Sequence, residues 1–132
     1  MQSGAILDGQ VTASSQWNSN HAPHQARLHY IPPAGKAGSW SAKTNDANQW
    51  LKVDLGTHSR VTRVASQGRY AVNQWVTKYK LQFGDDGNNF MDYQAAPGGA
   101  ATVRKRFDYM LLPSACIPSG YISQGQISVK SG

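Results

Sequence analysis

Short runs of alternating hydrophobic and polar residues recur along the chain. They cover residues 50–55, 60–65, 75–83 and 121–129. Alternation with a period of two puts successive side chains on opposite faces of an extended strand, so that one face packs on a core and the other meets water. The pattern therefore predicts short strands in half-buried sheets.

Turn residues separate these runs. Gly56 follows the first run, and the polar segment 85–89 lies between Phe83 and Phe90 as a hairpin tip would. Several short strands at this spacing indicate a β-sandwich or barrel.

Other segments lack the alternation. Residues 22–30 contain Pro23 near their start and predict at most a short helical turn. The Gly- and Ala-rich residues 97–101 and the basic run 104–106 are interpreted as a loop inside one domain, before the apolar residues 109–112. The chain shows no internal repeat, and its 132 residues fit a single domain covering 1–132.

Composition argues against catalysis. Glutamate is absent, so the seven acidic residues are all aspartates, and the commonest carboxylate for general acid–base chemistry is missing. The chain contains neither a Gly-x-Ser-x-Gly motif nor a metal-ligand signature. We therefore expect a protein that is not an enzyme and needs no cofactor or metal.

The net charge of +6 favours anionic partners without choosing among them. The start of the chain has no signal-peptide pattern, and no run is long and apolar enough to cross a membrane. Cys116 is the single cysteine, which excludes an intrachain disulfide and predicts either a buried thiol or an unpaired relic of divergence.

An ordered series of motifs makes the chain recognisable. Its members are 12–15 with Trp17, 25–28, 38–42, 48–56, 61–64, 67–69, 74–81, and 85–87 with Phe90. In this order the series resembles the coagulation factor V/VIII type C family, also called discoidin domains, over residues 11–93. The carboxy-terminal third departs from the family pattern, because the best match to its closing strand is residues 124–130 and the usual cysteine pair is missing.

The resemblance implies an all-β fold, a discoidin-type jelly-roll sandwich or barrel of about eight antiparallel strands with divergent C-terminal strands. It also implies that residues 17–24, 32–39 and 69–73 form loops at one end that bind the ligand. The candidate binding residues in these loops are Trp17, Asn18, Asn20, His21, His24, Lys36, Ser39, Arg69, Tyr70 and Asn73.

The four tryptophans are predicted to differ in burial. Trp40, Trp50 and Trp75 lie in or beside strand patterns and are predicted to pack in the core. Trp17 precedes a polar, turn-rich segment, where it either stays exposed for binding or folds back as a plug.

The histidines, two arginines and the acidic segment 85–88 could each have either a structural role or a role in binding. His21, His24 and His29 are expected to be polar loop residues that gain charge in acid, in preference to a zinc cluster. Arg27 is expected to pair with an aspartate, whereas Arg69 is expected to contact a ligand. Residues 85–88 are expected to form a turn and not a calcium loop.

Two functions follow from the resemblance. The first is an extracellular recognition module that mediates adhesion by binding anionic phospholipid membranes with its loops. The alternative is a lectin-like module for galactose-type glycans at a cell surface, in which a loop aromatic stacks on the sugar. An extracellular protein is a further candidate partner, and nucleic acid is not expected.

Overall fold

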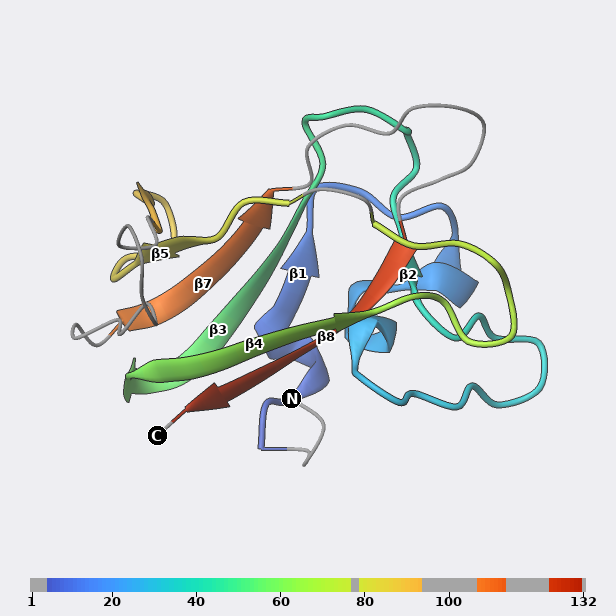
Figure 1. The fold of residues 1–132 in the computed structure, drawn as a ribbon, viewed down its shortest axis with the longest axis horizontal. Coiled ribbons are helices and arrows are strands. Elements are labelled where there is room, and N and C mark those ends of the chain that lie inside the picture. Colours follow the sequence, from blue (N-terminus) through green and yellow to red (C-terminus); the bar gives the residue numbers. More distant parts are fainter. Residues whose placement is uncertain (1–4, 77–78, 94–106, 114–123, 132) are drawn as a thin grey trace, which may run out of the picture.

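In the computed structural model, the chain forms two antiparallel sheets, and Figure 1 shows strands of the smaller sheet crossing in front of the larger one. The structure describes residues 5–76, 79–93, 107–113 and 124–131. The larger sheet has the order β1 (Val11–Ala13), β3 (Trp50–Ser59), β7 (Phe107–Pro113), β5 (Gln82–Gly84), β6 (Met91–Asp92). The smaller sheet has the order β2 (Trp40–Ser41), β8 (Gln124–Ser131), β4 (Val61–Gln67). The predicted two-sheet antiparallel architecture is confirmed.

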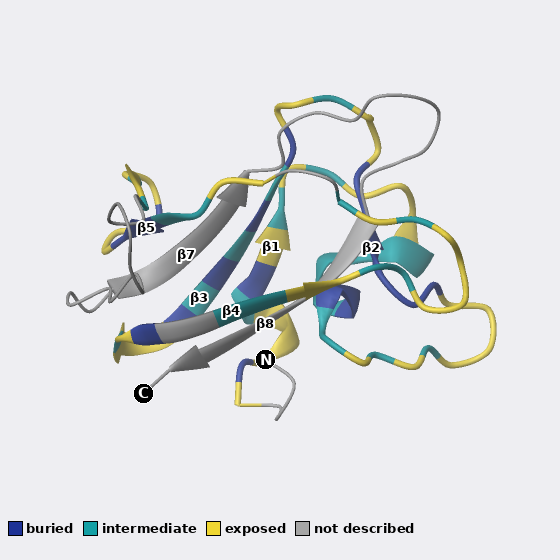
Figure 2. Ribbon diagram, viewed as in Figure 1, coloured by how far each residue is buried: buried dark blue, intermediate teal, exposed yellow. Residues whose placement is uncertain are grey.

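Strand β3 shows why the alternating pattern forms a sheet here. Leu51, Val53 and Leu55 are buried, and the residues between them are half-buried, as Figure 2 shows along the strand. Both neighbours of β3 pair with it in antiparallel register, with Val11 of β1 and Met110 of β7 opposite Val53. The buried face of β3 joins the hydrophobic core, whose buried members are Ile6, Val11, Ala26, Trp40, Ala42, Leu51, Val53, Leu55, Val61 and Phe83.

The predicted strand over residues 75–83 is wrong at Trp75 and Val76, and residues 77–78 lie outside the described residues. The strand β5 begins only at Gln82, and Trp75 lies outside it with 54% of its surface exposed. The reason is that the carbonyl oxygen of Gln74 accepts a hydrogen bond from the backbone N–H of Arg69, which closes a loop just before Trp75. The expectation that Trp75 packs in the core is wrong for the same reason.

The predicted hairpin after β5 is confirmed. Strand β6 pairs antiparallel with β5, and the Asp86 carboxylate accepts hydrogen bonds from the backbone N–H groups of Asn88 and Asn89 at 2.9 and 2.8 Å. These bonds and that from the Asn89 amide at 2.6 Å lower the pKa of Asp86 to about 2. The segment is therefore a carboxylate-capped turn.

Helical structure in the described part is limited to three short 3₁₀ turns. These are η1 (Asp8–Gln10), η2 (Ser19–His21) and η3 (Pro23–Ala26), of which the last matches the predicted helical turn. None of the described helices is long and apolar enough to cross a membrane. The predicted loop over 97–106 and the predicted buried thiol of Cys116 lie outside the described residues.

Candidate functional site

Three loops meet at one end of the sandwich, at the right in Figure 1. We call them loop A (residues 17–24), loop B (residues 32–39) and loop C (residues 69–73). The backbone N–H of Ala37 in loop B donates to the carbonyl oxygen of Asn20 in loop A at 2.9 Å, and the N–H of Tyr70 in loop C donates to the carbonyl oxygen of Gly38 at 3.4 Å. The structure thus brings together the three segments that the sequence singled out.

Loop A is organised around two asparagines. The Asn18 side-chain oxygen caps the turn η2 by accepting from the backbone N–H of Asn20 at 2.9 Å. The Asn20 side-chain oxygen in turn accepts from Nζ of Lys36 in loop B at 3.0 Å. These bonds hold the amides and the lysine in one polar surface.

His21 of loop A lies within electrostatic range of Arg69 of loop C. Partial burial, and then the positive charge of Arg69, lower the pKa of His21, so the imidazole is more strongly neutral at pH 7 than a free histidine. Its Nδ1 lies 2.8 Å from the Asn18 side-chain oxygen. A neutral ring that donates from Nδ1 keeps Nε2 as an acceptor. The gain of charge expected for His21 in acid is therefore shifted to lower pH.

Loop C is a tight, internally bonded turn. The Arg69 guanidinium donates to the side-chain oxygen of Gln74 at 2.9 Å, and the Gln74 N–H donates to the carbonyl oxygen of Val72 at 2.8 Å. Ala71 has a φ of 58°, in the left-handed region that non-glycine residues seldom adopt. The loop is thus held in a fixed shape that presents its side chains outward.

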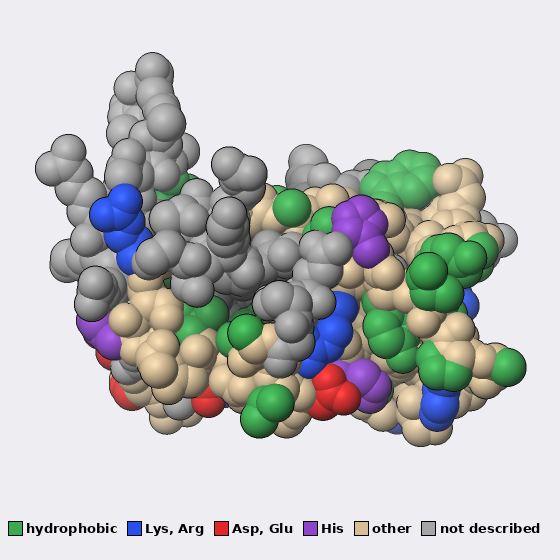
Figure 3. All heavy atoms as spheres, turned by 90° about the horizontal axis from the view of Figure 1, so that it is seen from below, with side chains coloured by type: hydrophobic (Ala, Val, Ile, Leu, Met, Phe, Trp, Pro, Cys, Tyr) green, Lys and Arg blue, Asp and Glu red, His purple; other side chains and the backbone are tan. Residues whose placement is uncertain are grey.

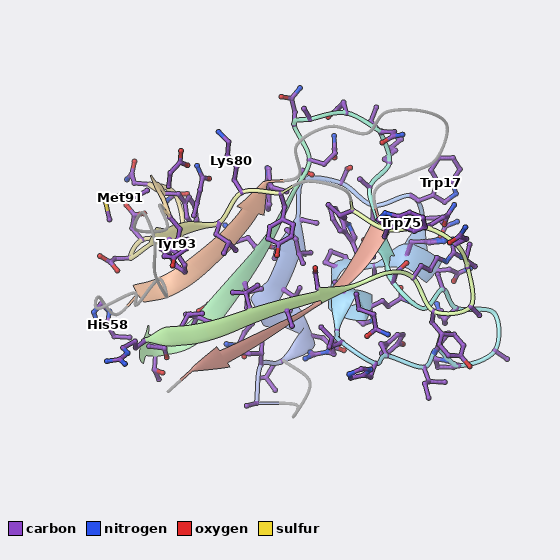
Figure 4. The ribbon with its side chains drawn as sticks, viewed as in Figure 1. Trp17, His58, Trp75, Lys80, Met91 and Tyr93 are labelled. Carbon is purple, nitrogen blue, oxygen red and sulfur yellow. The ribbon has the colours of Figure 1, made fainter. Side chains whose placement is uncertain are left out.

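Several large apolar side chains at this end are exposed to solvent. Their exposed fractions are 52% for Trp17, 71% for Ile31, 49% for Tyr70, 43% for Val72 and 54% for Trp75. Figure 4 places Trp17 and Trp75 at the loop-bearing end, and Figure 3 shows hydrophobic side chains gathered there beside basic and polar ones. The exposure of Trp17 decides between its two interpretations, because the ring does not act as a buried plug.

The other predicted binding residues divide by exposure. Asn73 is exposed, and His24 is half-buried. Ser39 is fully buried, so its hydroxyl cannot meet a ligand at the surface, and the prediction that it lies in the binding surface is wrong. Its segment enters the core ahead of Trp40, which is only 3% exposed and donates from its indole to the carbonyl oxygen of Ser15.

Sequence reasoning missed two contributors to the site. Trp75 was assigned to a strand because aromatic residues in an alternating run usually pack inside. Gln25 is buried and links loop A to loop B, accepting from the N–H of Ala22 at 2.6 Å and donating to the carbonyl oxygen of Ala37 at 2.7 Å. The presence of Gln25 in the motif 25–28 was the only signal for this second residue.

Arg27 has the structural role expected for it. Its guanidinium lies 2.7 Å from the carboxylate of Asp8 and donates to the carbonyl oxygen of Ile6 at 2.8 Å. Among the residues described, no group of three or more histidines, cysteines or acidic residues is placed to hold a metal ion.

Comparisons with known proteins agree with this architecture. The F5/8 type C domain family matches residues 10–111. Hemocytin of Bombyx mori is 36% identical over 103 residues, which are 78% of this chain but only 3% of hemocytin.

Solved structures show the same fold at low sequence identity. Discoidin II of Dictyostelium discoideum superposes with a TM-score of 0.75 at 18% identity, covering 92% of this chain and 54% of that one. A chitosan-binding module from a Paenibacillus chitosanase/glucanase gives 0.69 at 18% identity over 96% and 97% of the two chains. The family 32 module of C. perfringens NanJ, solved with galactose, gives 0.61 at 20% identity over 94% and 96%. The jelly-roll fold is thereby confirmed, and the chain belongs to the F5/8 type C, or discoidin, family.

Proposed function

We propose that residues 1–132 form one extracellular, non-catalytic recognition domain that binds galactose-type glycans at the loop-bearing end and so attaches its parent protein to surfaces. The observation that carries the proposal is the placement of exposed aromatic rings beside fixed polar groups. Tyr70 is half-exposed and directly follows Arg69, which lies within electrostatic reach of His21.

This combination suits a sugar. The apolar face of a pyranose ring stacks on an aromatic side chain, while its hydroxyl groups need donors and acceptors around the rim. Trp17 and Tyr70 offer the rings, His21 offers an acceptor at Nε2, and Asn20 and Arg69 offer further polar contacts.

Fixed loops support useful affinity. Ordering a mobile loop on binding costs free energy, and a loop already in its bound shape avoids that cost. The hydrogen bonds within loop C and between loops A and B hold the proposed site before any ligand arrives. Among the similar folds, the NanJ module was solved with galactose and the lectinolysin domain with Lewis b antigen, which favours a glycan as ligand.

Binding to an anionic phospholipid membrane is a second candidate, favoured by two aliphatic side chains. Ile31 just before loop B and Val72 in loop C are exposed, and loop B also carries the exposed Lys36. Aliphatic side chains that enter the acyl boundary, with lysine meeting head groups, are typical of interfacial attachment.

One experiment separates the two candidates. The purified domain is tested on a glycan array, on phosphatidylcholine vesicles and on phosphatidylserine vesicles, with Tyr70→Ala as the site variant. Met91→Ala is the matched control, because Met91 is 57% exposed and lies at the opposite end in Figure 4. Galactoside binding that Tyr70→Ala abolishes and Met91→Ala retains supports the glycan function. Binding confined to phosphatidylserine vesicles would overturn it in favour of the membrane.

A further inference from the structure

Acidic residues are absent from the parts of the chain that build the loop-bearing end. The seven aspartates are Asp8, Asp46, Asp54, Asp85, Asp86, Asp92 and Asp108. None falls within residues 9–45 or 55–84, which contain loops A, B and C entirely. In the view of Figure 3, most of the acidic side chains lie toward the other end, and one lies beside a histidine and a basic side chain nearer to the loop-bearing end.

Two of the four aspartates that flank these segments illustrate how such carboxylates are partnered. Asp8 pairs with Arg27 at 2.7 Å. Asp46 accepts hydrogen bonds from the backbone N–H of Asn48 at 2.8 Å and from the Gln49 amide at 2.9 Å, and these bonds lower its pKa. Each of these two carboxylates therefore binds groups of the chain itself.

Amide oxygens help to position two cations of the loops. Lys36 donates to the amide oxygen of Asn20 and Arg69 to that of Gln74. An amide oxygen orients a cation without cancelling its charge. The effect of Arg69 on the pKa of His21 shows that its positive charge is felt across the gap between loops C and A.

We propose that the preferred glycan is anionic, and that Arg69 and Lys36 contact a sulfate or carboxylate group on a sugar whose ring lies against the exposed aromatics. This inference rests on the proposed glycan function and narrows its ligand class. Arg69 would add a charge-assisted hydrogen bond to a carboxylate or sulfate, and Lys36 adds a point charge from loop B. The glycan's negative charge would be the complement that loops A, B and C do not supply themselves.

The test uses three saccharides that share one core. Lactose, 3′-sulfolactose and 3′-sialyllactose are titrated calorimetrically into the whole chain at low and at raised salt. The variants are Arg69→Gln, Lys36→Gln and the control Lys80→Gln. Each variant removes one positive charge, but Lys80 is exposed and lies away from loops A, B and C in Figure 4.

The expected result is a preference tied to the site. The affinity for at least one anionic saccharide should be at least about fivefold higher than that for lactose, as expected for a charge-assisted contact at a partly exposed site. The preference should shrink with salt. Arg69→Gln and Lys36→Gln should each reduce it, and Lys80→Gln should leave it unchanged. Because Lys36 is exposed, its variant tests the inference even if Arg69→Gln disturbs loop C.

The contrary outcomes are distinct. Equal binding of lactose and the two anionic saccharides would overturn this inference and leave the glycan function standing. An anionic preference that all three variants reduce alike would also overturn it, because the effect would come from the overall charge of +6. Failure of all three saccharides, with binding to phosphatidylserine vesicles, would overturn both proposals.

Discussion

The backbone of Gly38 lies directly against the side chain of Tyr70. A Cβ atom added to Gly38 would overlap the Cβ of Tyr70, and the Tyr70 N–H donates to the Gly38 carbonyl oxygen. Loops B and C can approach this closely only because residue 38 has no side chain. Their joint surface therefore depends on one glycine.

Gly38→Ala should separate these two loops. We expect a loss of about 1–3 kcal/mol in unfolding free energy, because the added methyl group forces a backbone shift, together with weaker ligand binding. Urea unfolding and glycan titration measure the two effects. Gly9→Ala is the control, since nothing lies within 4 Å of a Cβ there. Equal behaviour of the two variants would argue against the close contact.

The left-handed residue in loop C gives a second prediction. Ala71→Val should destabilise the domain by about 1 kcal/mol or more, because a β-branched side chain is poorly compatible with a φ of 58°. Ala71→Gly should leave stability nearly unchanged, since relief of strain offsets the entropy that glycine loses on folding. Thermal unfolding of the two variants checks this order, and the reverse order would contradict the assigned conformation.

Substitution of Trp75 should affect ligand binding, whereas substitution of Trp40 should affect stability. Trp75→Ala should weaken ligand binding with little loss of stability, because half of the ring is already exposed beside loop C. Trp40→Ala should cost about 3–5 kcal/mol of unfolding free energy, since it empties a buried site and removes the indole hydrogen bond to Ser15. The opposite result would be a large loss of stability with normal ligand binding by the molecules that stay folded. It would assign Trp75 to the core and not to the binding surface.

The hairpin turn should contribute a pH-dependent part of the stability. The pKa of Asp86 is lowered to about 2 from 3.8, so its charged form is favoured in the folded state. Its stabilising effect should be complete at pH values above about 4 and should fade as the pH drops toward 2. The quantity to measure is the stability difference between wild type and Asp86→Ala across that range. A difference that stays constant down to pH 2 would mean that the charged carboxylate stabilises the fold no more than its protonated form does.

The sequence predicted those features that local chemistry decides. The alternation around Leu51 and Val53 could be interpreted directly, because burial of one face of β3 is what maintains it. The turn at Asp86 could also be predicted from its polar, glycine-containing segment. Loops A, B and C came from the family resemblance, since no local pattern indicates which loops meet in space.

Contacts between individual side chains of different loops could not be predicted from the sequence. His21 and Arg69 lie in different loops, and only the fold reveals that the charge of one lowers the pKa of the other. Trp75 was misplaced because its run alternates as a strand does, while the hydrogen bond between Arg69 and Gln74 ends that regularity earlier. Ser39 was misplaced because a serine one residue before a strand can face either side.

The placement of the last two strands governs how the domain forms. Strand β7 pairs between β3 and β5, and β8 pairs between β2 and β4, so the last two described strands occupy the interior of both sheets. A nascent chain emerging from the ribosome therefore cannot close either sheet until residues 107–131 have been synthesised. The search for such distant partners is slow in comparison with local helix formation. Until β7 and β8 have paired, the edges of β3 and β4 are open to pairing with other chains, so the domain is most exposed to aggregation before these two strands join the sheets.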